Sequence, residues 1–147
     1  MNHIRRALVA ALVICIARPL AALAAWNKEA FGAKTAGDAL KSLGIGNATA
    51  SDDLKVEVPQ IAENGAVVPI EISSAIPGTT ALIVVIDKNR IPIVTRVALT
   101  PASGQAYMGA NIRLGETTDV RAVIEQSDGT LLAVKREVKV TVGGCGG

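Results

Sequence analysis

Leu131-Leu-Ala-Val-Lys-Arg-Glu-Val-Lys-Val-Thr-Val142 is the stretch of sequence that decides the fold. Valines stand at even-numbered positions, with charged or hydroxyl side chains between them: Val134, Val138, Val140 and Val142 against Lys135, Glu137, Lys139 and Thr141. A period of two with one apolar face predicts an antiparallel strand that buries one side and exposes the other.

Further runs rich in valine and isoleucine lie upstream of this strand. Asn64-Gly65, Pro77-Gly78, the segment 101–104 and Asp128-Gly129 supply the turns between them. The predicted strands are 54–58, 67–73, 81–87, 91–100, 106–114, 118–126 and 131–142. About seven such strands are typical of an immunoglobulin-like antiparallel β-sandwich, which we expect over residues 52–142 without an internal disulfide. The fold class is therefore mainly β.

Two prolines fall inside the predicted strands, at Pro69 and Pro92. Proline donates no hydrogen bond to a β-ladder, so each position predicts a sheet edge or a bulge. Such an edge either protects the sheet against unwanted pairing or stays accessible for a partner. Both interpretations are open at this point.

Residues 26–46 are predicted to form a helical segment ahead of the sandwich. Thr35-Ala-Gly-Asp38 resembles a capping box with a shorter acid, and Gly44 suits a helix C-terminus. Gly32 and Gly37 weaken a continuous helix, so we expect two short helices. The apolar side chains, which need a partner surface, are Phe31, Leu40 and Leu43.

The first 25 residues have the order of a cleavable signal peptide. Arg5-Arg6 precedes an apolar run at 7–17, and Ala22-Leu23-Ala24 fits the small-residue cleavage site. The apolar run is too short to span a bilayer. The paired arginines resemble a twin-arginine signal, and the general secretory route also stays open. We expect a periplasmic mature protein that begins at residue 25 or 26.

Removing the leader changes the chemical inventory of the chain. His3 is the sole histidine and Cys15 one of two cysteines, so Cys145 is left as the single thiol. Ser-His-Asp and Cys-His nucleophile pairs and clustered zinc ligands are therefore excluded, and no cofactor is expected. Three of the 15 basic residues also leave, against 13 acidic ones, so the mature chain is near neutral and has no basic stripe for nucleic acid.

Val142-Gly-Gly-Cys-Gly-Gly147 follows the last predicted strand directly. The glycines that flank Cys145 have no side chains to bury and the most backbone entropy to lose, so they predict a flexible tether: Gly143, Gly144, Gly146 and Gly147. Five extended residues reach about 16 Å. The thiol would be both nucleophile and attachment point in the pocket of another protein.

Three other interpretations of this tail are open. The cysteine could sit incidentally on a frayed terminus. It could form an intermolecular disulfide, which would make the chain an exported immunoglobulin-like interaction module. A terminal Gly-Gly also occurs in carriers that form a thiocarboxylate, but their activation is cytoplasmic, and the signal peptide argues against it.

The sequence resembles the SoxY family of the bacterial Sox thiosulfate-oxidising system. Three segments carry the resemblance: Val140-Thr-Val-Gly-Gly-Cys-Gly-Gly147, Pro59-Gln-Ile-Ala-Glu-Asn-Gly-Ala-Val-Val-Pro69, and the helical part from Ala30 through Leu43. The family often has Asn-Pro in the middle of the sandwich, where this chain has Lys88-Asn-Arg-Ile-Pro92.

The resemblance implies a non-catalytic carrier that holds thiosulfonate and persulfide sulfur covalently on Cys145. It implies that residues 143–147 are a swinging arm. It also implies a SoxZ-like subunit as heterodimer partner, together with haem-containing SoxAX-type, hydrolytic SoxB-type and dehydrogenase SoxCD-type enzymes. Three arginines could attract an anionic adduct, but we expect them to be solvent-facing strand residues: Arg96, Arg113 and Arg121.

Overall fold

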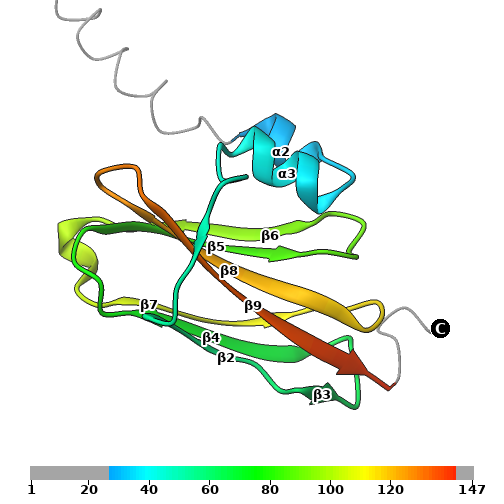
Figure 1. Cartoon of the computed structure of the whole chain (residues 1–147). Helices are drawn as coiled ribbons and strands as arrows, with labels where there is room; N and C mark the ends of the chain where they lie inside the picture. The colour runs from blue at the N-terminus through cyan, green and yellow to red at the C-terminus, as the bar shows by residue number, and fades with distance from the viewer. Residues whose placement is uncertain (1–26, 142–147) are drawn as a thin grey trace, which may run out of the picture.

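Two β-sheets face each other across an apolar core in the computed structural model, which describes residues 27–141 (Figure 1). The four long strands of the larger sheet have the order β9-β8-β5-β6, and neighbours among these four are antiparallel. Its strands are β5 (Thr79–Ile86), β6 (Ile93–Ala98), β8 (Thr118–Gln126) and β9 (Leu131–Val140). The smaller antiparallel sheet has the order β2-β4-β7, with strands β2 (Leu54–Glu57), β4 (Val68–Ser74) and β7 (Ala106–Ile112).

Two very short strands complete the larger sheet along the outer edge of β9. β1 (Thr49–Ala50) and β3 (Ile61–Ala62) both run parallel to β9, the first beside its beginning and the second beside its end. The seven predicted strands are confirmed within a few residues at their ends, and 118–126 coincides with β8. β1 and β3 were not predicted, because two residues are too few to display a period.

β9 has the two faces that its sequence predicts. Val134 and Val138 are buried, whereas Lys135, Glu137 and Lys139 are exposed. Pairing with β8 runs from Leu131 opposite Glu125 to Val138 opposite Thr118, so the register holds over most of the strand. The last predicted strand position, Val142, lies outside the described residues.

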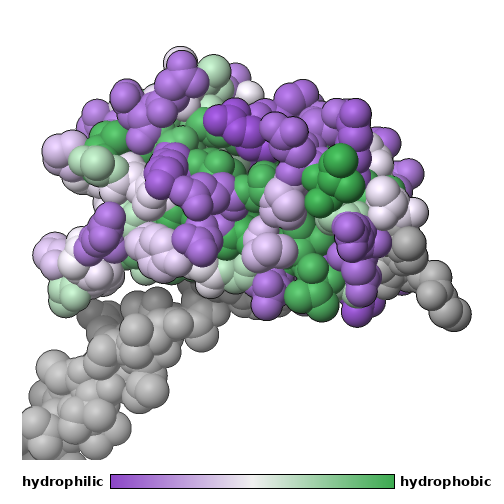
Figure 2. All heavy atoms as spheres, turned by 90° about the horizontal axis from the view of Figure 1, so that it is seen from below, coloured by the Kyte–Doolittle hydropathy of each residue, from purple (hydrophilic) through white to green (hydrophobic). Residues whose placement is uncertain are grey.

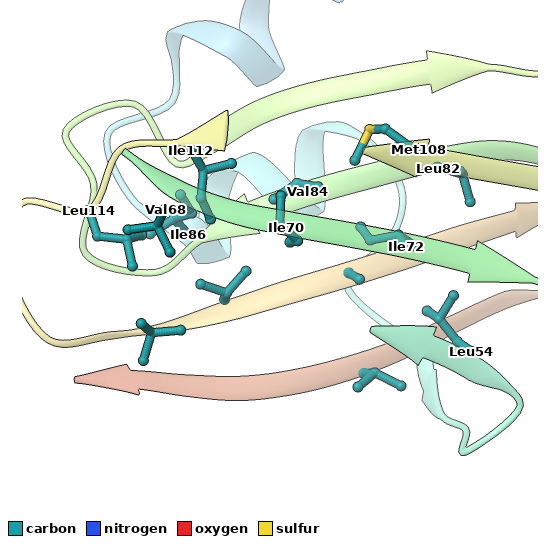
Figure 3. Packing of buried hydrophobic residues seen from close by; sticks show 14 of the residues in the cluster. Leu54, Val68, Ile70, Ile72, Leu82, Val84, Ile86, Met108, Ile112 and Leu114 are labelled. Atoms are coloured by element: carbon teal, nitrogen blue, oxygen red, sulfur yellow. The ribbon is translucent and has the colours of Figure 1, made fainter. Parts of the chain in front are cut away.

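The core between the sheets consists of aliphatic side chains that point inward from alternate positions (Figure 3). In β4, Val68, Ile70 and Ile72 are buried, while Pro69 and Glu71 between them are exposed. Burying an aliphatic side chain contributes about 1.5–3 kcal/mol. Other residues of this core include Leu54, Leu82, Val84, Ile86, Met108, Ile112 and, just after β7, Leu114.

β5 is buried on both faces, which explains why its sequence is a continuous run of apolar residues from Ala81 to Ile86. Its even-numbered residues face the core, whereas Ile83 and Val85 form a second apolar cluster with the helices outside the sheet. Two helical alanines, Ala30 and Ala39, are fully buried in this second cluster. Their small side chains allow the helices to approach the sheet closely, and the predicted apolar residues Phe31, Leu40 and Leu43 pack around them.

The predicted pair of short helices is confirmed as α2 (Lys28–Gly32) and α3 (Ala36–Ser42). At the start of α3, the Thr35 hydroxyl oxygen accepts a hydrogen bond of 3.1 Å from the Asp38 amide and donates one of 2.7 Å to the Asp38 carboxylate. At its end, Gly44 adopts φ +73°. The amide of Ile45 then reaches back to the Leu40 carbonyl at 2.8 Å, which closes a Schellman motif.

No helix among residues 27–141 is long and apolar enough to cross a bilayer.

Both prolines stand at an edge or a bulge, as their chemistry predicts. β2 pairs with β4 only from Glu71 to Ser74, so β4 has a free side at Pro69. Pro92 precedes the edge strand β6, and the register between β5 and β6 shifts beside it, between Val84 and Val85. Whether either edge serves a partner stays a prediction.

Two glycine substitutions test the helical layer. Gly44→Ala should lower the free energy of unfolding by about 1 kcal/mol, because an L-residue is strained at positive φ. Gly32→Ala should raise it by about 0.5 kcal/mol, because an added methyl group meets open space and alanine favours helix. Urea titration measures both values, and a stabilising Gly44→Ala would contradict this description of the α3 end.

Candidate functional site

The end of β9 is held on both sides at the point where the chain continues toward Cys145. The Val140 amide donates to the Thr117 hydroxyl oxygen at 3.0 Å. On the other side, the Thr141 amide donates to the Ala62 carbonyl at 3.1 Å, and the Thr141 hydroxyl donates to the Glu63 carbonyl at 3.2 Å. Thr141 is therefore a fixed root for the segment that follows it.

The sequence-predicted site residues lie outside the described part of the chain. They are the attachment residue Cys145 and the arm residues Gly143, Gly144, Gly146 and Gly147. What the structure places is their point of departure, at the end of the sandwich where β3 and β9 lie side by side (Figure 1).

The loop between β3 and β4 borders this root. The Asn64 side-chain oxygen accepts a hydrogen bond of 2.8 Å from the Ala66 amide, which forms the turn predicted at Asn64-Gly65. The Gly65 carbonyl accepts another of 2.7 Å from Leu114. The Thr141 hydroxyl holds Glu63 at one end of the loop, and Leu114, two residues after β7, holds Gly65 in its middle.

Two of the three arginines considered for anion binding lie on the larger sheet, where each forms an ion pair. Arg96 pairs with Glu125 at 2.9 Å on the outer face of the larger sheet. Arg121 makes a two-pronged contact with Asp87, 2.6 Å for each nitrogen–oxygen pair. The hydrogen bond to Asp87 is the main cause that raises the pKa of Arg121. Both are surface strand residues, as predicted, and already have carboxylate partners.

Arg113 differs from the other two. It lies just beyond β7 in an exposed position, so the expectation of a strand residue was wrong for it. Its guanidinium makes no ion pair with any residue in the described range 27–141.

The outer face of the smaller sheet carries a second polar arrangement. Glu71 stands opposite Gly109 in the register of β4 and β7. A Cβ atom at Gly109 would lie 2.9 Å from the Tyr107 hydroxyl oxygen, so the glycine leaves room for this side chain to reach Glu71. The negative charge of Glu71 raises the pKa of Tyr107, and burial and the hydrogen bond to Glu71 add to the effect. Figure 2 views this side of the molecule and shows apolar side chains scattered among polar ones.

A groove of about 470 Å³ lies where the chain crosses from β2 to β3. Val56 and Val58 line it together with Arg136 and Glu137 from β9 and Glu71 from β4. Among residues 27–141, no three His, Cys, Asp or Glu side chains are grouped so that they could hold a metal ion.

Comparison with known proteins identifies the family. The family model of sulfur oxidation protein SoxY matches residues 41–145, most of the chain, and its match ends at Cys145. The solved structure of the sulfur carrier protein SoxY from Chlorobium limicola f thiosulfatophilum is 29% identical with a TM-score of 0.62. That likeness covers 71% of this chain and 96% of the other.

The chain belongs to the SoxY family. Membership makes it a sulfur carrier protein of the Sox sulfur-oxidation system, whose members work with Sox partners such as SoxZ. The family match also confirms the mainly β, immunoglobulin-like fold. The helical residues ahead of position 41 precede the matched range.

More distant structures share only the fold. A superoxide reductase (neelaredoxin) from Ignicoccus hospitalis is 16% identical with a TM-score of 0.53, covering 63% of this chain and 80% of that one. A putative superoxide reductase from Thermotoga maritima is 14% identical with a TM-score of 0.51, covering 63% and 93%. No curated protein matches the chain.

Tyr107 offers a direct test of the polar arrangement on the smaller sheet, because it is the sole tyrosine of the chain. Its pKa should lie above the ordinary value near 10.0, and Glu71→Gln should lower it toward that value. Ultraviolet titration of tyrosinate measures the shift. Glu116→Gln, in the loop after β7, is the matched control and should leave the pKa unchanged.

The same shift fixes the sign of a pH effect on stability. The raised pKa means that the folded state favours neutral Tyr107. The stabilisation that this gives to the folded state is fully present below the pKa of tyrosine in the unfolded chain. It is lost as the pH rises through the pKa of Tyr107 in the folded protein. An unchanged titration curve in Glu71→Gln would show that Glu71 is not the cause.

Proposed function

We propose that this SoxY-family chain is a periplasmic carrier that holds sulfur intermediates covalently on Cys145 and presents them to partner enzymes. The observation that carries the proposal is the family match, which runs to Cys145 itself. The fixed root at Thr141 supports it, because a carrier needs its cargo to start from a defined position. The leader at 1–25 supports export.

The carrier cycle begins with oxidative attachment of thiosulfate. A haem-containing SoxAX-type partner joins the Cys145 sulfur to the outer sulfur of thiosulfate and accepts two electrons, while the thiol proton is released. The product is a cysteine S-thiosulfonate. A SoxB-type hydrolase then adds water across the terminal sulfur–sulfur bond, which releases sulfate and a proton and leaves a persulfide on Cys145.

A SoxCD-type dehydrogenase takes the persulfide sulfur further by oxidation. In each step this chain supplies the thiol, the tether and a docking surface, and the partner supplies the redox or hydrolytic chemistry. The glycines on both sides of Cys145 would offer no side chain to clash in a narrow channel. A SoxZ-like subunit would complete the carrier as a stable heterodimer.

Intact mass spectrometry tests the proposal directly. The mature protein from thiosulfate-grown cells should carry a reducible adduct on Cys145 with the mass of S₂O₃ or of added sulfur atoms. Cys145→Ser should lose the adduct and abolish thiosulfate oxidation, with an unchanged unfolding transition, because the described core of the sandwich is made by other residues. If wild-type protein carries only free thiol or a disulfide across growth conditions, the chain is instead an interaction module.

Gly144→Pro separates a mobile carrier from a simple cross-linker. Proline fixes φ between the root and the cysteine and limits the directions in which the thiol can be delivered. We expect turnover with partner enzymes to fall about tenfold, an effect of about 1.4 kcal/mol on the barrier. Gly146→Pro, beyond the cysteine, is the matched control and should have a smaller effect. Equal effects of the two changes would contradict the role of residues 143–144 as the tether.

A further inference from the structure

The positive charges of the sandwich divide into paired and unpaired side chains. Four cations on the sheet faces have carboxylate partners: Lys55 with Glu57, Arg96 with Glu125, Arg121 with Asp87 and Lys135 with Asp119. Three exposed cations in the connections after β5 and β7 make no ion pair with any residue between 27 and 141. They are called here the cationic triplet: Lys88, Arg90 and Arg113.

One hydrogen bond joins the two connections that carry the triplet. The Asn89 side-chain amide donates to the Arg113 carbonyl at 2.8 Å, so the turn between β5 and β6 rests against the end of β7. Lys88 and Arg90 are the immediate neighbours of Asn89. The Lys88 amide donates to the Thr118 hydroxyl oxygen at 3.1 Å, which fixes the turn to the start of β8. The three cations therefore belong to two segments with a fixed relative position.

The triplet lies at the end of the sandwich where β9 ends, because the β5–β6 and β7–β8 connections are both there (Figure 1). The Thr117 hydroxyl oxygen accepts a hydrogen bond of 3.0 Å from the Val140 amide, next to Thr141. Arg113 is four residues before Thr117, and Cys145 is four residues after Thr141, so each spacing is at most about 14 Å between Cα atoms. With the arginine side chain and a sulfur adduct added, a group on Cys145 can reach the triplet.

We propose that the cationic triplet is a binding site for the terminal sulfonate of the Cys145 adduct, which holds the loaded arm against its own domain. The proposal deepens the proposed function and rests on it. Guanidinium and ammonium groups donate charge-assisted hydrogen bonds to anionic oxygens, and such bonds are stronger than those between neutral groups. The occupant is the segment 142–147 of this chain in its S-thiosulfonate form, because the tether brings that anion within reach.

A tether makes a weak site sufficient. An exposed ion pair contributes at most about 1 kcal/mol, so the triplet binds a free anion only weakly. A short flexible tether gives its load an effective concentration on the order of millimolar, which compensates for the low affinity. Two exposed carboxylates, Glu63 and Glu116, lie at the same end, and Lys139 adds a further cation. The unpaired cations outnumber these carboxylates, so the site attracts an anionic load.

The contact depends on the load. The sulfonate of an S-thiosulfonate carries a permanent negative charge, whereas a protonated thiol carries none. When the SoxB-type hydrolase releases sulfate, the group that the triplet binds leaves with it. The triplet therefore holds the arm while the arm carries the oxidised group and loses this contact once sulfate has been released.

The test uses the carrier with its SoxZ-like subunit, labelled with ¹⁵N in the carrier alone and loaded without any enzyme. Inorganic tetrathionate loads it, because the Cys145 thiolate attacks a central sulfur, forms the S-thiosulfonate and displaces thiosulfate. Methyl methanethiosulfonate is the matched control: the same thiolate displaces methanesulfinate and acquires a neutral methyl disulfide. Intact mass confirms each load, and NMR follows the Nε–H groups of Arg90 and Arg113 and the amide of Leu114.

The S-thiosulfonate should shift the Nε–H resonance of Arg113, and removal of the load with dithiothreitol should restore it. About 1 M NaCl should also abolish the shift, because the screening length is then only about 3 Å. The neutral methyl disulfide should leave the resonance near its position in the unloaded carrier.

Charge removal gives a second readout. In Cys145→Ser carrier, which cannot be loaded, inorganic thiosulfate should bind the triplet with a millimolar Kd. Adding Lys88→Gln/Arg90→Gln/Arg113→Gln should raise this Kd about tenfold, as the Leu114 amide reports, and Arg113→Gln alone should give part of the effect.

Lys55→Gln is the matched control for the loss of a cation and should leave the thiosulfate Kd unchanged. Lys55 pairs with Ser73, five residues along β4 from Val68, which pairs with Ile112 beside Arg113. The control therefore lies about 17 Å away along the sheet.

Three results would overturn the sulfonate site while the carrier function stands. The first is no shift with the S-thiosulfonate, or an equal shift with both loads. The second is binding of free thiosulfate at the triplet without a response to the tethered load, which would assign the site to a free anion. The third is a triplet whose resonances respond to the SoxZ-like subunit and not to loading, which would assign it to the permanent interface. Failure of the SoxB-type hydrolase to release sulfate from loaded wild-type carrier would instead contradict the proposed function, whatever the resonances show.

Discussion

The two-sided pairing of β9 is the constraint on which the rest of the structure depends. β8 pairs with one edge along most of its length, and β1 and β3 occupy the beginning and the end of the other. Val134 and Val138 anchor the same strand in the core. Because both edges and one face are held, Thr141 has a defined position, and everything the chain does beyond it starts from there.

The residues that stabilise the fold are different from the residue proposed to carry sulfur. Aliphatic side chains fill the space between the sheets, and a second apolar cluster binds the helices to the outside, so β5 is buried on both faces. The charged pairs of the larger sheet, such as Arg121 with Asp87, lie on its outer face. This division agrees with a family of carriers, in which the domain holds and presents a group while other proteins transform it.

Much of the fold was predictable because its signals are local. Alternation in 131–142, the turn glycines and the capping residues Thr35 and Asp38 each act over a few neighbouring positions. Ala30 and Ala39 were missed as the buried helical residues, since their burial depends on how closely the helices approach β5. Arg113 was misplaced because the end of β7 depends on its pairing with β4.

The sequence by itself determined the mainly β architecture, the pair of short helices and the single cysteine among glycines at 143–147, because periodicity and composition are properties of adjacent residues. Only the tertiary structure decided what surrounds the root of that segment. Ala62 and Glu63 are far from Thr141 in sequence, and their carbonyls accept its hydrogen bonds because two residues of β3 pair in parallel with the end of β9. A pairing so short has no period in the sequence, and its stability comes from neighbours that folding brings together.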